Sequence, residues 1–186
     1  MILYDELTKI TREYEPDEAY KLVLSIKDPW ENLDSIIDFV RRWNKRVPIG
    51  KNKDEIKKVV LSLQDKFSAF KNTYIENFEF TQESDNLIRN IFDDLSRTVL
   101  KYTGTSKLMH GINPKLFFMW DKGICIHYGV YPNSAGYVNF MKLMRNEIKE
   151  LLKEHSKEEI LKNTNRTLPK LIDEYNWEHF RTSKSK

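Results

Sequence analysis

Apolar residues recur every three to four positions along most of this 186-residue chain, and this spacing constrains the fold more than any other feature. Such a period places the apolar side chains on one face of an α-helix. The chain contains only 6 Gly and 6 Pro, which argues against a turn-rich β fold. The sequence therefore predicts an all-α protein, a bundle of about eight helices.

Residue pairs and quartets typical of helix starts divide these periodic segments. Asp28-Pro29-Trp30-Glu31 combines a capping residue with Pro at the first helical position, and Asn52-Lys53-Asp54-Glu55 repeats the pattern without the Pro. Further starts are predicted at Thr81 or Ser84, near Ser134, at Ser156 and at Thr167. The segments 2–14 and 17–27 also have helical character and are separated by Pro16.

The chain length fits a single domain over residues 1–186, with a bend predicted at 47–52 and a frayed tail at 182–186. No apolar run reaches the roughly 18–20 residues of a membrane-spanning helix, and the start of the chain lacks the basic character of a signal peptide. Cys125 is the only cysteine, so no internal disulfide can form. We expect a cytoplasmic protein. Abundant Lys and Glu with two Gln suggest a thermophilic source, although fourteen Asn point the other way.

Basic residues are concentrated in two parts of the chain, although the net charge is only +3. Residues 41–66 hold nine Lys and Arg against three acidic residues, and residues 97–123 hold five against one. Basic stretches of this kind can face the phosphates of DNA, an acidic protein, or only solvent. If the partner is DNA, the candidate contacts are Arg41, Arg42, Lys45, Arg46, Lys51, Lys53, Lys57, Lys58, Lys101 and Lys115.

The segment 103–129 differs from the long helices because five Gly and Pro residues punctuate it. This punctuation predicts a cluster of short helices, one of them ending at Gly111 and another starting at Asn113-Pro114. Residues 124–131 are rich in β-branched and aromatic residues, so a short strand is an alternative there. The apolar residues 117–120 are predicted to lie in the core and to anchor Asp121, which stands where a helix N-cap is expected.

The sequence FFMWDKGICIHY at 117–128 resembles the end of the core motif of the helix-hairpin-helix DNA glycosylase superfamily, in which an apolar segment leads to an aspartate and then to a helix. The resemblance covers about residues 101–128. It implies that Asp121 stabilises the cationic sugar that forms as a base leaves. It also implies that Lys107, fourteen residues earlier, corresponds to the catalytic lysine of the members with lyase activity. Trp120, Tyr128 and His110 are the residues that we expect around an extruded base.

Other site chemistry has little support. His110, Asp121, Cys125 and His127 match no usual zinc spacing, so neither a metal nor another cofactor is expected. The sequence also fits a helical module that binds a protein or forms a dimer without catalysing a reaction, and it leaves the oligomeric state open.

Overall fold

The computed structural model describes residues 2, 4–13, 18–162 and 164–180, and these residues form an all-α protein. They fold into eleven α-helices and two short 3-10 helices, with no strand among them. The prediction of an all-α, multi-helix protein is confirmed. The strand considered for residues 124–131 is wrong, because the first residues of this segment belong to a short helix, α8.

The helices follow one another with short links, in the order α1 Tyr4–Glu13, α2 Glu18–Ser25, α3 Leu33–Trp43, η1 Ile49–Asn52, α4 Lys53–Ser62, α5 Gln64–Ser68, η2 Ile75–Asn77, α6 Gln82–Ser96, α7 Lys101–Ile112, α8 Lys122–His127, α9 Ser134–Glu154, α10 Lys157–Leu161 and α11 Leu168–Phe180.

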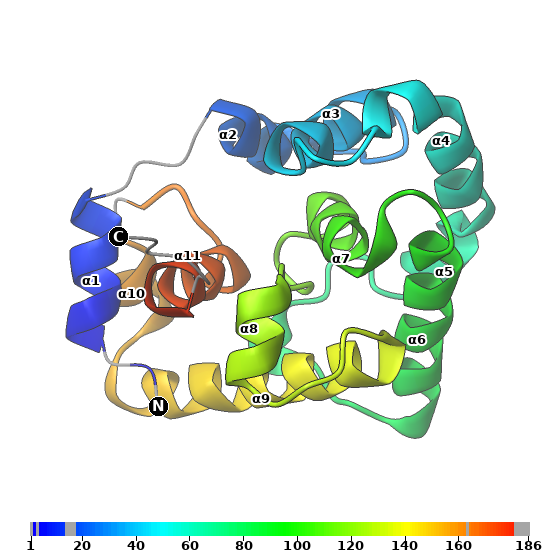
Figure 1. The fold of residues 1–186 in the computed structure, drawn as a ribbon. Helices are drawn as coiled ribbons and strands as arrows, with labels where there is room; N and C mark the ends of the chain where they lie inside the picture. The colour runs from blue at the N-terminus through cyan, green and yellow to red at the C-terminus, as the bar shows by residue number, and fades with distance from the viewer. Residues whose placement is uncertain (1, 3, 14–17, 163, 181–186) are drawn as a thin grey trace.

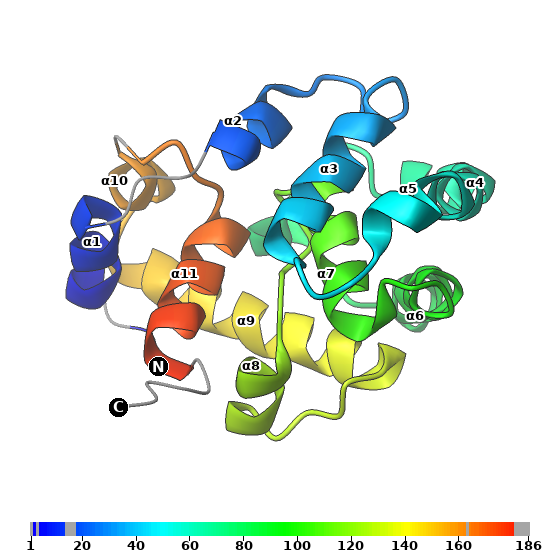
Figure 2. The same cartoon turned by 45° about the horizontal axis from the view of Figure 1, so that its top comes forward.

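Helix α7 lies at the centre of the molecule, between α3 on one side and α6 on the other (Figure 1). The longest helix, α9, packs against α6 and continues beneath α11. Helix α11 contacts both α1 and α8. In both views α8 lies close to α9 and to α11, which it contacts (Figure 1 and Figure 2).

Most of the predicted helix starts are observed, with side-chain caps. The Thr81 hydroxyl accepts a hydrogen bond from the Ser84 amide, and the Ser84 hydroxyl accepts one from the Thr81 amide. Ser156 caps α10, Asn133 caps α9, and the Thr167 hydroxyl accepts from the Lys170 amide. These caps satisfy backbone amides that have no partner inside their own helices.

The start predicted at Asp28 is wrong by several residues. The Asp28 carboxylate accepts a hydrogen bond from the Trp30 amide, but residues 29–32 form only a turn, and α3 begins at Leu33. The helix predicted to start at Asn52 is also short, because the chain leaves the α-helical path at Leu63, between α4 and α5. The segment 47–52 contains η1, a 3-10 turn that leads directly into α4.

The prediction that glycines break the segment after residue 103 is wrong for α7. This helix runs without interruption through Gly104 to Ile112. A Cβ atom on Gly111 would lie 2.6 Å from the Ile36 side chain, and one on Gly104 would lie 2.9 Å from Asn44 Nδ2. The two glycines therefore allow α3 to pack closely against α7, which is a packing role and not a turn.

The frayed tail predicted at 182–186 lies outside the residues that the structure describes. No helix in the described part of the chain is both long enough and apolar enough to cross a membrane.

Candidate functional site

The extended segment 117–120 connects α7 to α8 and is buried along its whole length. Its backbone polar groups are paired with side chains of neighbouring helices. The Phe117 carbonyl is bonded to His110 Nδ1, the Phe118 carbonyl accepts from the Tyr137 hydroxyl, and the Trp120 amide donates to the Ser106 hydroxyl. These bonds fix the segment, and with it the position of the next residue, Asp121.

Asp121 is the N-cap of α8, as the sequence predicts. Its Oδ1 accepts a hydrogen bond from the Ile124 amide at 3.0 Å. The residue is partly exposed, and within the described chain its second carboxylate oxygen accepts no hydrogen bond. The capping role therefore occupies one oxygen and leaves the other available for a ligand or for a developing charge.

Lys107 projects from α7 towards the end of α3, where its ammonium donates a hydrogen bond to the Trp43 carbonyl at 2.8 Å. Burial lowers the pKa of Lys107 below its ordinary value. The negative charges of Asp173 and Asp121 act in the opposite direction, and the positive charge of Lys170 adds a small lowering effect. Lys107 therefore lies within electrostatic reach of Asp121, although fourteen residues separate them in the sequence.

Lys170 and Asp173 complete a polar cluster that the sequence does not indicate. The buried Lys170 ammonium lies 3.0 Å from Asp173 Oδ2 and 3.3 Å from Glu174 Oε1. It also lies over the Trp43 ring, 4.3 Å from the ring centroid. Trp43 thus links the two lysines, because its carbonyl accepts from Lys107 while its ring covers Lys170. We call Lys107, Asp121, Lys170 and Asp173 the α7–α11 cluster.

The three residues expected around an extruded base are not brought together as an open pocket. Trp120 is 1% exposed and packs among the rings of Phe92, Tyr137 and Phe140. Tyr128 is half-buried and donates its hydroxyl to Asn176. In this structure neither Trp120 nor the fully buried His110 offers a ring face to a ligand.

His110 has an electrostatic environment that fixes its tautomer. Its Nδ1 lies 2.7 Å from the Phe117 carbonyl oxygen, so Nδ1 carries the hydrogen. Its Nε2 is buried and has no hydrogen-bond partner within the described part of the chain. Burial lowers the pKa of His110 to about 3, and this effect outweighs the carbonyl bond, which acts in the opposite direction.

The predicted basic contacts divide into paired and unpaired groups. Lys53 and Lys57 form ion pairs with Asp34, which lower the pKa of that carboxylate, and Arg41 lies 3.5 Å from Asp38. Lys115 donates to the Tyr74 hydroxyl beside a cavity of about 110 Å³ that is also lined by residues of α10 and the start of α11. Among the predicted contacts, the exposed cations for which the described residues provide no ion pair are Arg42, Lys45, Arg46, Lys51, Lys58 and Lys101. Three of these, Arg42, Lys45 and Arg46, lie within three positions of Trp43 in the sequence, and the Trp43 carbonyl accepts the hydrogen bond from Lys107.

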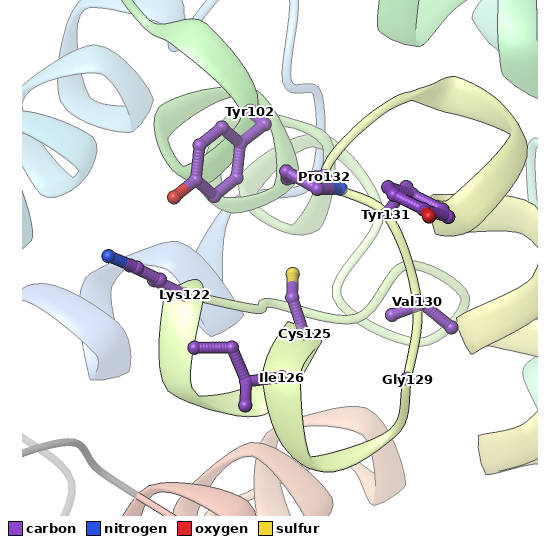
Figure 3. Close-up of a pocket in the computed structure, with 8 residues that line it drawn as sticks. All are labelled: Tyr102, Lys122, Cys125, Ile126, Gly129, Val130, Tyr131 and Pro132. Carbon is purple, nitrogen blue, oxygen red and sulfur yellow. The ribbon is translucent and has the colours of Figure 1, made fainter.

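A larger cavity, of about 460 Å³, lies beside α8 (Figure 3). We call it the α8 cavity, and its lining residues are Tyr102, Lys122, Cys125, Ile126, Gly129, Val130, Tyr131 and Pro132. The Cys125 thiol points into it, between Tyr102 and Val130 in this view. Burial and the Asp121 charge raise the pKa of this thiol to about 12, so it stays neutral.

Comparisons with known proteins give no independent assignment. No protein-family model, no curated protein and no solved structure matches this chain. Among the described residues, no three His, Cys, Asp or Glu side chains form a group able to hold a metal ion. The candidate chemistry therefore rests on the α7–α11 cluster and the α8 cavity.

Proposed function

We propose that this protein acts on DNA as a glycosylase with lyase activity, using Lys107 as the nucleophile and Asp121 to stabilise the sugar cation. The observation that carries the proposal is the hydrogen bond from the Trp120 amide to the Ser106 hydroxyl, which holds the residue before Asp121 against the turn of α7 that carries Lys107. The charge of Asp121 also acts on Lys107, and both residues are partly exposed. The resemblance at 101–128 assigns the two residues these roles.

The local environment of Lys107 suits a nucleophilic amine. A lysine attacks only in its neutral form, and partial removal from water favours that form. Its lowered pKa gives Lys107 a larger neutral fraction near neutral pH than an exposed lysine has. Lys107 is partly exposed, so its proton can pass to solvent before the reaction, and Asp121 keeps its negative charge.

The proposed reaction proceeds by displacement at C1′ of the deoxyribose. The neutral Lys107 amine forms a bond to C1′ while the base leaves with the electrons of the glycosidic bond. Positive charge develops on the sugar. The carboxylate oxygen of Asp121 that does not accept from the Ile124 amide can face this charge. Loss of a proton and opening of the sugar ring then give an imine between Lys107 and the sugar, which precedes strand cleavage.

The unpaired cations near the end of α3 support a DNA substrate. Arg42, Lys45 and Arg46 are exposed close to the carbonyl that binds Lys107. Cations in this position can hold phosphates on either side of a nucleotide presented to the cluster. Binding through them should weaken steeply as salt concentration rises.

The test uses labelled duplexes that each contain one uracil, 8-oxoguanine, hypoxanthine, thymine glycol or abasic site. We expect at least one duplex to be cleaved and to become covalently attached to the protein when borohydride is added. Lys107→Met removes the amine and should abolish this attachment. Asp121→Asn keeps a capping side chain but removes the charge, and it should slow base release by about 100-fold or more.

The matched control is Lys149→Met, which removes an exposed lysine on α9 and should leave activity unchanged. If no duplex is processed or attached, or if Lys107→Met retains both activities, the proposal is wrong. Salt-sensitive DNA binding without any cleavage would point to a binding module instead.

A further inference from the structure

The α8 cavity combines the two most exposed large apolar side chains of the described protein. Ile126 is 63% exposed and Tyr131 is 79% exposed, and both line the same hollow. Single exposed apolar residues are ordinary on protein surfaces, but apolar side chains gathered around a cavity commonly mark a binding site. The volume of about 460 Å³ falls within the range of roughly 300–1,000 Å³ that is usual for small-molecule sites.

The wall that carries Tyr131 is fixed by contacts that do not involve its ring. The Val130 amide donates to the Cys125 carbonyl, and Asn133 caps α9 by accepting from the Gly136 amide. A Cβ atom on Gly136 would lie 1.9 Å from the Tyr131 carbonyl oxygen, so only glycine permits this approach. The fold therefore holds the Tyr131 backbone in place while its ring stays in solvent, where it contributes little to packing.

The polar groups of the cavity define what it can hold. Its interior carries the neutral Cys125 thiol and apolar side chains, while Tyr102 and Tyr131 provide aromatic rings with hydroxyl groups. Lys122 contributes an exposed ammonium for which the described residues supply no ion pair. A planar, uncharged group attached to an anion matches this arrangement, and a nucleotide of a single strand has both parts.

We propose that the α8 cavity binds an unpaired nucleobase next to the nucleotide presented to Lys107, with the base against Tyr131 and its phosphate on Lys122. This inference rests on the proposed action on DNA, but it concerns a second position. Neither Lys107 nor Asp121 belongs to the lining of the cavity, yet Lys122 directly follows Asp121 in the chain. A strand can therefore reach both places with neighbouring nucleotides.

The test measures binding without any reaction, by fluorescence anisotropy of two labelled 11-nucleotide strands. One strand is oligo(dT), and the other has the same phosphates but carries tetrahydrofuran in place of every base. Stacking of one base strengthens binding by roughly 5- to 100-fold, so we expect oligo(dT) to bind about tenfold more tightly. Tyr131→Ala should remove most of this preference, and Tyr131→Phe should retain it.

Lys122→Met should weaken the binding of both strands. It should also reduce the slope of log affinity against log salt concentration by about the amount expected for one phosphate contact. Leu61→Ala is the matched control, because Leu61 is an exposed apolar residue on α4, outside the cavity lining. Each variant is first checked by thermal unfolding, and the exposed position of Tyr131 should leave its variants folded.

Equal binding of the two strands, or a preference that survives Tyr131→Ala, would overturn the nucleobase site. Self-association that Tyr131→Ala abolishes, without strand binding, would show that a second copy covers the cavity and would also overturn it. The glycosylase proposal is judged separately by borohydride attachment at Lys107. A base preference that depends on Tyr131 would support the cavity even if no lesion is processed.

Discussion

Helices α6 and α7 pack against each other at the centre of the molecule, but they are buried in different ways. Five of the fifteen α6 residues are buried, and they form one face of the helix. Seven of the twelve α7 residues are buried, including Gly104, Thr105, Ser106 and His110, and they surround the helix. A helix packed on all sides must accommodate close neighbours and polar groups within the core, and α7 does both.

Both helices carry buried polar atoms without a hydrogen-bond partner among the described residues, so this property does not distinguish them. On α6, Asp85 is paired with Lys142 of α9 through Oδ2, but its Oδ1 accepts no hydrogen bond there. On α7 such an atom is His110 Nε2, and Lys107 belongs to the α7–α11 cluster with Asp121. Only α7 therefore contributes a residue to the proposed site.

The largest expected effect concerns the stability of the protein in acid, which depends on the buried His110 of α7. The pKa of His110 is about 3 in the folded protein and about 6.5 when the chain is unfolded, so between these values the unfolded chain binds the additional proton. The free energy of unfolding should therefore fall as pH decreases from 6.5 towards 3, by an amount on the order of several kcal/mol. Urea unfolding at a series of pH values measures this dependence.

His110→Gln is the comparison for that experiment, because Gln does not titrate in this range. The variant should show a shallower decline in acid, whatever its stability at neutral pH. Parallel pH dependences of the two proteins would contradict the burial of a neutral His110.

Next in size is the effect of adding a methyl group between α7 and α3. Gly111→Ala would place a Cβ atom 2.6 Å from the Ile36 side chain, and such overpacking costs about 1–3 kcal/mol. This cost should exceed the gain of about 1 kcal/mol that Ala provides over Gly within a helix. Chemical denaturation measures the balance, and a variant more stable than the original protein would show that α3 and α7 are not closely packed here.

A smaller loss is expected at the start of α6. Thr81→Ala removes the hydroxyl that accepts from the Ser84 amide, and it should lower the free energy of unfolding by about 1 kcal/mol. Thr81→Ser keeps the cap and should have almost no effect in the same measurement. Equal losses in the two variants would assign the effect to the methyl group of Thr81 and not to the cap.

The smallest effect should have the opposite sign. Asn90 is exposed in the middle of α6, where Ala is the better helix former, so Asn90→Ala should stabilise the protein by about 0.5 kcal/mol. The same change to Ala thus stabilises α6 and destabilises α7 at Gly111. Two effects of equal sign would remove the distinction between the two helices.

The predictions made from sequence succeed where one helix face is apolar and the cap is local. Thr81, Ser156 and Asp121 lie next to the amides they cap, so a few neighbouring residues determine their role. In α7 the glycines look like breaks, because the residues that require them, Ile36 and Asn44, are sixty or more positions away. A local pattern cannot distinguish a glycine needed for a turn from one needed for contact with a distant helix.

The candidate site shows the same limit. A resemblance of about 28 residues singles out Lys107 and Asp121, and it stays a prediction until base release is measured. Lys170 and Asp173 were missed because an acidic residue three positions after a lysine on a helix usually lies in solvent. Tyr131, beside Pro132 in a short loop, carries no sequence signal of its exposed ring.

The sequence by itself determined the all-α class, most of the helix starts and the capping role of Asp121, because these depend on residues within one or two turns of each other. Only the tertiary structure decided that α7 lies at the centre, that the charges of Asp121 and Asp173 act on Lys107, and that Trp120 and His110 are covered. These features arise from contacts between residues far apart in the chain, where burial and charge depend on neighbours that no local pattern identifies.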